Sequence, residues 1–150
     1  MEKILITILL ADDDKEDRYF FARALKKIPI PTQLITLEDG EALLDYLAKN
    51  ADNLPDILFL DINMPRKNGL EALKEINGNK KIKPFPIIIY STSLDEDVAD
   101  VFYNFGAYYY VQKSDFNELV RKLEFILNIF EGKNFKRPAR EKFIFNLQEA

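Results

Sequence analysis

The chain has 150 residues, of which 47% are hydrophobic and 31% charged, with a formal net charge of −4 and neither cysteine nor histidine. This composition is typical of one globular domain large enough to form a hydrophobic core. The missing residue types exclude disulfides, thiolate or imidazole metal sites and a Ser-His-Asp triad, and the negative charge argues against nonspecific nucleic-acid binding.

The chain opens with a predicted strand, residues 4–11, which is rich in Ile and Leu and is followed by Asp12, Asp13 and Asp14. The opening stretch has neither a basic start nor a small-residue cleavage site, so we do not expect a signal peptide. No apolar run reaches the length of a transmembrane segment. We therefore expect a cytoplasmic protein that does not act at a membrane.

The rest of the chain alternates between helical and strand patterns. Short apolar runs bounded by turn residues predict four further strands, at residues 33–37, 57–60, 86–91 and 107–112. Apolar residues at helical spacing predict five helices, at residues 15–27, 41–49, 69–76, 94–105 and 116–131. This alternation indicates an α/β fold with a parallel sheet and helices on both of its faces.

Capping residues bound several of these helices. Asp14 and Asp115 are predicted to cap the first and last helices, and Ser93 with Glu96 fits a capping box for the fourth. Gly106 follows the fourth helix at a position where glycine stops helices.

Polar side chains follow four of the five predicted strands. They are Asp12 and Asp13 after the first, Asp61 after the third, Ser91 and Thr92 at the fourth, and Lys113 after the fifth. In a doubly wound sheet these strand ends lie close together. Carboxylates that converge repel one another, and Mg²⁺ neutralises them well because it prefers carboxylate and carbonyl oxygens.

This arrangement suggests a chemical hypothesis. Asp61 would be a nucleophile that accepts a phosphoryl group, and Mg²⁺ and Lys113 would stabilise the group in transfer. Each residue also has a purely structural alternative, because Asp61 would serve as a loop cap and Lys113 as a solvated surface lysine.

With these residues in this order, the sequence resembles a response-regulator receiver domain, the phosphoacceptor module of two-component signalling. The matching stretches are residues 9–14, 58–65 with Gly69, 89–92 and 110–113. Within the family it most resembles the stand-alone regulators that serve phytochrome kinases. The resemblance covers about residues 3–131 and implies a flavodoxin-like doubly wound (βα)5 sandwich with strand order 2-1-3-4-5.

The resemblance also implies a role for each residue of the set. In this family pattern Asp61 is the phosphoacceptor and Lys113 pairs with the phosphate. Mg²⁺ is bound by Asp12, Asp13 and the backbone carbonyl of Asn63. The switch positions are those of Ser91, with Thr92 beside it, and Tyr110. One departure is visible, because Ser114 stands where the family usually has proline after this lysine.

The implied function is that of a single-domain response regulator. A sensor histidine kinase or phosphotransfer protein would supply the phosphoryl group, and the phosphorylated form would bind a downstream protein. The chain would catalyse only its own phosphoryl uptake and autodephosphorylation, so it would not be an enzyme in the usual sense. The alternatives are a pseudo-receiver that only binds partners, and a haloacid-dehalogenase-type phosphatase, which needs a second aspartate where Asn63 stands.

We expect residues 1–131 to form the receiver domain and residues 132–150 a basic-aromatic tail with no separate effector domain. Output would therefore be protein–protein contact and not DNA binding. The tail is expected to pack on the acidic domain or to pair in a homodimer, and nucleic-acid binding by its basic and aromatic residues is a less favoured alternative. We expect four aromatic residues to form an output surface, or alternatively to belong in part to the core, namely Phe102, Tyr103, Tyr108 and Tyr110.

Overall fold

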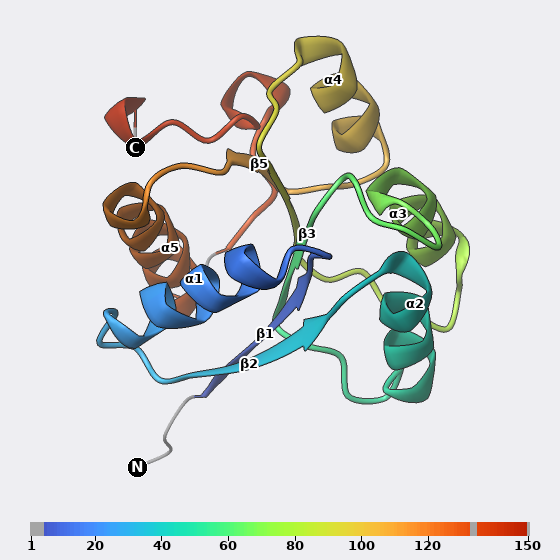
Figure 1. Cartoon of the computed structure of the whole chain (residues 1–150). Helices are drawn as coiled ribbons and strands as arrows, with labels where there is room; N and C mark the ends of the chain where they lie inside the picture. Colours follow the sequence, from blue (N-terminus) through green and yellow to red (C-terminus); the bar gives the residue numbers. More distant parts are fainter. Residues whose placement is uncertain (1–4, 133–134, 150) are drawn as a thin grey trace.

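A computed structural model describes residues 5–132 and 135–149 and contains a parallel sheet in the order β2-β1-β3-β4-β5 (Figure 1). The strands are β1 (Ile6–Ala11), β2 (Thr32–Leu37), β3 (Ile57–Leu60), β4 (Ile87–Ser91) and β5 (Tyr109–Gln112). The helices are α1 (Lys15–Lys26), α2 (Gly40–Lys49), α3 (Gly69–Gly78), α4 (Glu96–Asn104) and α5 (Phe116–Glu131). The predicted fold class and strand order are confirmed. Residues 1–4, 133, 134 and 150, which include the start of the predicted first strand and part of the tail, lie outside the described residues.

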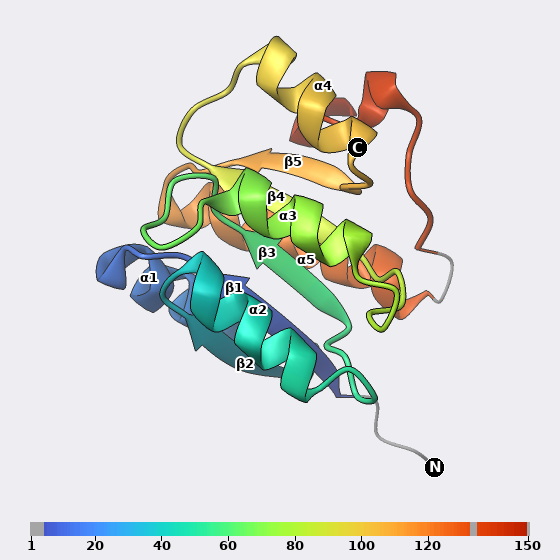
Figure 2. The same ribbon diagram turned by 90° about the vertical axis from the view of Figure 1, so that its right-hand side faces the viewer.

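The side chains of the strands alternate between two cores, one on each face of the sheet. On β3, Leu58 and Leu60 pack with α2, α3 and α4, whereas Ile57 and Phe59 pack with α1 and α5. Figure 2 shows α2 and α3 in front of the sheet, with α1 and α5 behind it. Both faces of the central strands are therefore covered, and their polar residues are confined to the strand ends.

The helix caps agree with the sequence except at α4. The Asp14 and Asp115 carboxylates accept hydrogen bonds from the first turns of α1 and α5, as predicted. The expectation that Ser93 caps α4 is wrong, because Asp95 accepts from the amides of the first turn instead. The Ser93 hydroxyl lies 3.3 Å from the Ser91 hydroxyl, so it points back toward the end of β4 and away from the helix.

The chain after α5 returns along β5 and pairs with it. The Tyr110 amide donates to the Phe143 carbonyl, and the Phe145 amide donates to the Tyr110 carbonyl, both at 2.9 Å. The Phe143 ring is fully buried, 5.2 Å from the Tyr103 ring and 6.2 Å from the Tyr110 ring. Residues 135–149, called the C-terminal segment below, therefore pack on the domain, which was one of the two expectations for the tail (Figure 1).

The expected aromatic output surface is largely absent from the described structure. Phe102 and Tyr110 belong to the core, with 1% and 0% of their surface exposed. The Tyr103 hydroxyl donates to the Pro138 carbonyl at 2.9 Å, and the Arg137 guanidinium lies over the Tyr103 ring. The alternative assignment to the core was correct for two of the four residues. The C-terminal segment contacts the other two, because the Tyr108 ring also lies 5.6 Å from the Phe135 ring.

None of the helices in the described part of the chain combines the length and the apolar composition that crossing a bilayer requires.

Phe143 gives a direct test of the C-terminal segment. Phe143→Ala should lower the free energy of unfolding by about 3–5 kcal/mol, because it removes a fully buried ring and leaves a cavity. Urea denaturation measures the change, with the exposed Lys136→Ala as the matched control in the same segment. A change within about 0.5 kcal/mol would show that the segment does not hold this position in solution.

Candidate functional site

Three carboxylates meet at the carboxyl ends of β1 and β3. Oxygens of Asp12, Asp13 and Asp61 all lie within 4.8 Å of one another. The sheet fixes this geometry, since the Asp61 amide donates to the Ala11 carbonyl at 2.9 Å and the Asp12 amide donates to the Leu37 carbonyl at 3.0 Å. Asp12 is fully buried and Asp61 is 6% exposed, whereas Asp13 is open to solvent.

Asp14 is separate from this cluster, because its carboxylate accepts from the amides of Glu16 and Asp17 at the start of α1. Of the three adjacent acids, only the first two therefore belong to the site, as the predicted end of the first strand suggested.

Lys113 reaches the acids from the end of β5. Its ammonium donates to Asp12 and to Asp17, each at 2.8 Å, and lies 3.8 Å from Asp61. Asp17 was not predicted as a site residue, because an acid in the first turn of a helix is also explained by its favourable interaction with the helix dipole. Its position one turn after the Asp14 cap, on the helix that follows Asp12, was the available signal.

Burial and crowding change the acidity of this cluster. The pKa of Asp61 is raised to about 7. Burial is the larger cause and the nearby Asp12 carboxylate the next, and Lys113 offsets only part of this effect. Burial also raises the pKa of Asp12. Burial alone would lower the pKa of Lys113, but its hydrogen bonds to Asp12 and Asp17 raise it above the ordinary value. The cluster carries more negative charge than one lysine neutralises.

The donor set fits a small hard cation. Mg²⁺ takes a few carboxylate or carbonyl oxygens and keeps several waters, and the exposed Asp13 leaves room for such waters. The described residues offer this site carboxylates and a lysine, and the chain has no cysteine or histidine that would favour a softer metal.

Metal binding should depend on pH through Asp61. Below pH 7 a cation must displace the proton that Asp61 holds, so the apparent affinity for Mg²⁺ should rise up to about tenfold per pH unit and level off above pH 7. Isothermal titration calorimetry between pH 5.5 and 8.5 measures this dependence. In Asp61→Asn the slope should be much smaller, and an equal slope in both proteins would assign the titration to another group.

The hydroxyl and aromatic switch candidates lie beside the cluster. Ser91 is buried at the end of β4, and its hydroxyl accepts from the Ser93 amide at 3.3 Å. The Tyr110 ring is already inside the protein, with its hydroxyl donating to the Ser93 carbonyl at 2.8 Å. Tyr110, which the resemblance placed at a switch position, is therefore packed inside the protein in this structure. Thr92 is exposed, and its carbonyl accepts from the Gln112 side chain at 3.1 Å.

The loop between β3 and α3 packs tightly around Asp61. Gly69 begins α3 so close to the strand end that a Cβ there would lie 2.3 Å from the Asp61 carbonyl oxygen. Asn68 caps α3 in a capping box with Glu71, a feature that was not predicted. Asn63 is exposed in this loop. Glycine at position 69 therefore keeps the loop close to the acids.

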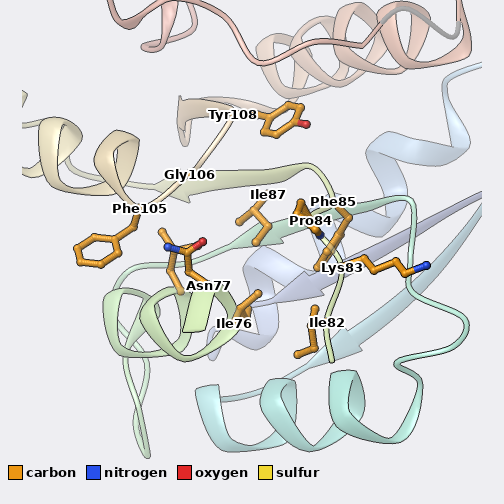
Figure 3. Close-up of a pocket in the computed structure, with 11 residues that line it drawn as sticks. Ile76, Asn77, Ile82, Lys83, Pro84, Phe85, Ile87, Phe105, Gly106 and Tyr108 are labelled. Carbon is orange, nitrogen blue, oxygen red and sulfur yellow. The ribbon is translucent and has the colours of Figure 1, made fainter. Parts of the chain in front are cut away.

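A separate hollow of about 130 Å³ lies at the opposite end of β4 (Figure 3). Figure 3 shows Ile76, Asn77 and Phe105 on one side of it and Pro84 and Phe85 on another. Ile87, the first residue of β4, also lines it, and none of its lining residues is a carboxylate. The groups suited to metal or phosphoryl chemistry are therefore gathered at the carboxyl end of the sheet.

Comparison with known proteins identifies similar sequences. Residues 8–124 match the family model described as the response regulator receiver domain. Response regulator Rcp1 of Synechocystis is 34% identical over 111 residues, which are 71% of this chain and 76% of the relative.

Two solved structures of such proteins are similar to this one. The Mn²⁺-bound form of Rcp1 has a TM-score of 0.73 and 31% identity, and the match covers 89% of this chain and 99% of that one. The phosphorylated cyanobacterial phytochrome response regulator RcpA has a TM-score of 0.78 and 28% identity, with 91% and 100% covered.

Proposed function

Because the chain belongs to the family of response regulator receiver domains, we propose that Asp61 is its phosphoacceptor and that it acts as a stand-alone response regulator. Receiver domains are signalling modules that take a phosphoryl group from a histidine kinase and act on downstream targets. The observation that carries the assignment to Asp61 is the convergence of three carboxylates and Lys113 at one end of the sheet.

Asp61 is suited to the nucleophilic role. Its carboxylate is slightly open to solvent and lies 3.8 Å from the Lys113 ammonium without a hydrogen bond to it, whereas the fully buried Asp12 is hydrogen-bonded to Lys113 at 2.8 Å. One Asp61 oxygen attacks phosphorus, the bond from phosphorus to the donor nitrogen breaks, and an acyl phosphate forms. Lys113 then pairs with the oxygens of the transferred group.

The acid cluster would hold Mg²⁺ through Asp12, Asp13, Asp61 and the backbone carbonyl of Asn63. Bound there, the metal supplies positive charge that stabilises the phosphoryl group in transfer. Receiver domains bind a divalent metal at such an acidic pocket, and the Rcp1 structure contains Mn²⁺. Mg²⁺ is our proposal for the ion, because the ligands here are hard oxygens.

The signal would leave the site through Ser91 and Tyr110. A phosphoryl group on Asp61 attracts the Ser91 hydroxyl, which now contacts Ser93, and Ser93 in turn holds Tyr110 through its carbonyl. The Tyr110 backbone pairs with the C-terminal segment, so a shift of this residue is transmitted to the surface that α4, β5 and the segment form together. Such a change biases an existing two-state equilibrium.

The partners proposed for this chain are a sensor histidine kinase or phosphotransfer protein, which donates the group, and a protein target that reads the surface beside α4. A homodimer through this surface is a further candidate. The chain would act only on its own phosphate, by uptake and autodephosphorylation. Family membership disfavours the haloacid-dehalogenase-type phosphatase. The presence of the complete acid set and Lys113 argues against a pseudo-receiver.

Incubation with acetyl phosphate and Mg²⁺ tests the proposal. Intact-mass spectrometry should show the gain of one phosphoryl group, and omission of Mg²⁺ should prevent it. If the small donor gives no labelling, beryllofluoride binding at the same site is the second measurement. A folded protein that takes neither would be a pseudo-receiver.

A further inference from the structure

Lys122 is an unusual lysine, because it lies on the buried side of α5. Only 9% of its surface is exposed. No carboxylate of the described residues lies within 4 Å of its ammonium. Burial lowers the pKa of Lys122, and the charges of Glu118 and Asp115 offset only part of that effect. A lysine so placed without a specific contact would destabilise the fold.

The contacts of Lys122 lie on both sides of Lys113. Its ammonium donates to the Gln112 carbonyl at 2.8 Å and to the Ser114 hydroxyl at 3.1 Å. Ser114 is the residue that departs from the family pattern, and its hydroxyl thus has a partner in α5. The described residues contain no cis peptide bond, so the peptide bond between Lys113 and Ser114 is trans.

The same peptide group is also held from its other side. The Lys113 amide donates to the Ser91 carbonyl at 2.7 Å, so the carbonyl and the amide of the Gln112–Lys113 peptide are both bonded. One bond comes from α5 and the other from β4. The plane of this peptide fixes where the Lys113 side chain leaves the backbone, and the ammonium at its end must reach Asp12 and Asp61.

We propose that Lys122 is a positioning residue that holds the Gln112–Lys113 peptide between α5 and β4, and thereby aims Lys113 at the acid cluster. Lys122 touches none of the reacting groups in the described structure and acts only through Lys113. The effect that this positioning has on phosphoryl transfer rests on the proposed function, in which Lys113 pairs with the transferred group. A misplacement of about 1 Å at such a group costs about 100-fold in rate.

Lys122→Met tests the proposal, because methionine keeps an unbranched apolar side chain but donates no hydrogen bond. The rate of phosphoryl uptake from acetyl phosphate should fall about 10- to 100-fold. Hydrogen exchange of the Lys113 amide should become about tenfold faster or more, while exchange in β1 and β3 stays unchanged. The affinity for Mg²⁺ should change little, since Asp12, Asp13 and Asp61 make no contact with Lys122.

Two further variants complete the experiment. Ser114→Ala removes one of the two hydrogen-bond acceptors of Lys122 and leaves the Lys122 side chain in place. This variant should slow phosphoryl uptake about fivefold, and it tests the proposal if Lys122→Met does not fold. Arg121→Met, an exposed neighbour on the same helix, should match the unmodified protein.

Wild-type rates and wild-type exchange at Lys113 in a folded Lys122→Met would overturn the proposal. An equal loss of Mg²⁺ affinity would also overturn it, because it would indicate a general structural role. If the unmodified protein takes no phosphoryl group, the proposed function fails, and the exchange of the Lys113 amide still decides whether Lys122 positions this peptide.

Discussion

Asp61→Asn should take up no phosphoryl group from acetyl phosphate in the presence of Mg²⁺. The amide of asparagine has no carboxylate oxygen with which to attack phosphorus, and neither of the other two acids of the site occupies the position of Asp61. Asp12 is fully buried and bonded to Lys113, and Asp13 lies on the solvent side of the cluster. Intact-mass spectrometry with peptide mapping measures the result. Labelling of Asp13 in the variant would show that the site tolerates a second acceptor, and undiminished labelling at position 61 would refute the assignment.

The same substitution should stabilise the metal-free protein. Asp61 has a raised pKa of about 7, so from about pH 4 to pH 7 the folded protein keeps a proton that the unfolded chain has lost. The free energy of unfolding therefore falls as the pH rises through this range. Asparagine removes this penalty, and urea denaturation at about pH 8 should show a gain of up to about 4 kcal/mol. The gain should shrink toward pH 5, where Asp61 is protonated when folded.

Lys113→Met should slow phosphoryl uptake by about 10²–10³-fold. The variant removes the only cation that lies within 4 Å of both Asp12 and Asp61 among the described residues, so the oxygens of the transferring group lose their charge partner. Rapid quench with acetyl phosphate at saturating Mg²⁺ measures the rate.

The affinity for Mg²⁺ should move in the opposite direction in Lys113→Met. Without the ammonium, Asp12 gains a free oxygen and the cluster becomes more negative, so the metal should bind more tightly. Lys49→Met, which alters an exposed lysine at the end of α2, is the control for charge alone. A parallel loss of uptake and of Mg²⁺ affinity would mean that Lys113 only holds the fold together.

The fold and the acid cluster could be predicted because they follow from local patterns. Apolar runs ending in Asp12, Asp61, Ser91 or Lys113 identify buried strands and also the edge at which their polar ends meet. The caps at Asp14 and Asp115 follow from side-chain chemistry within one turn of a helix. Such information lies within a few residues of each position.

Other features depend on contacts between distant residues, and these could not be predicted. Nothing near Lys122 in the sequence shows that its ammonium ends beside Gln112 and Ser114, because helical spacing places a lysine on a face but not beside a particular carbonyl. The Asp17 contact with Lys113 spans 96 residues. Ser93 was assigned to a cap because the sequence does not show that its hydroxyl faces Ser91.

The pairing of β5 with the C-terminal segment has a consequence for solubility. β5 is the last strand of the sheet, and a bare last strand offers its free amides and carbonyls to any other extended chain. Here the amide and the carbonyl of Tyr110 are both occupied by the segment, and Phe143 covers the apolar surface beside them. A protein shortened to end after α5 would expose an open β edge next to aromatic side chains, and it should aggregate more readily than the intact chain.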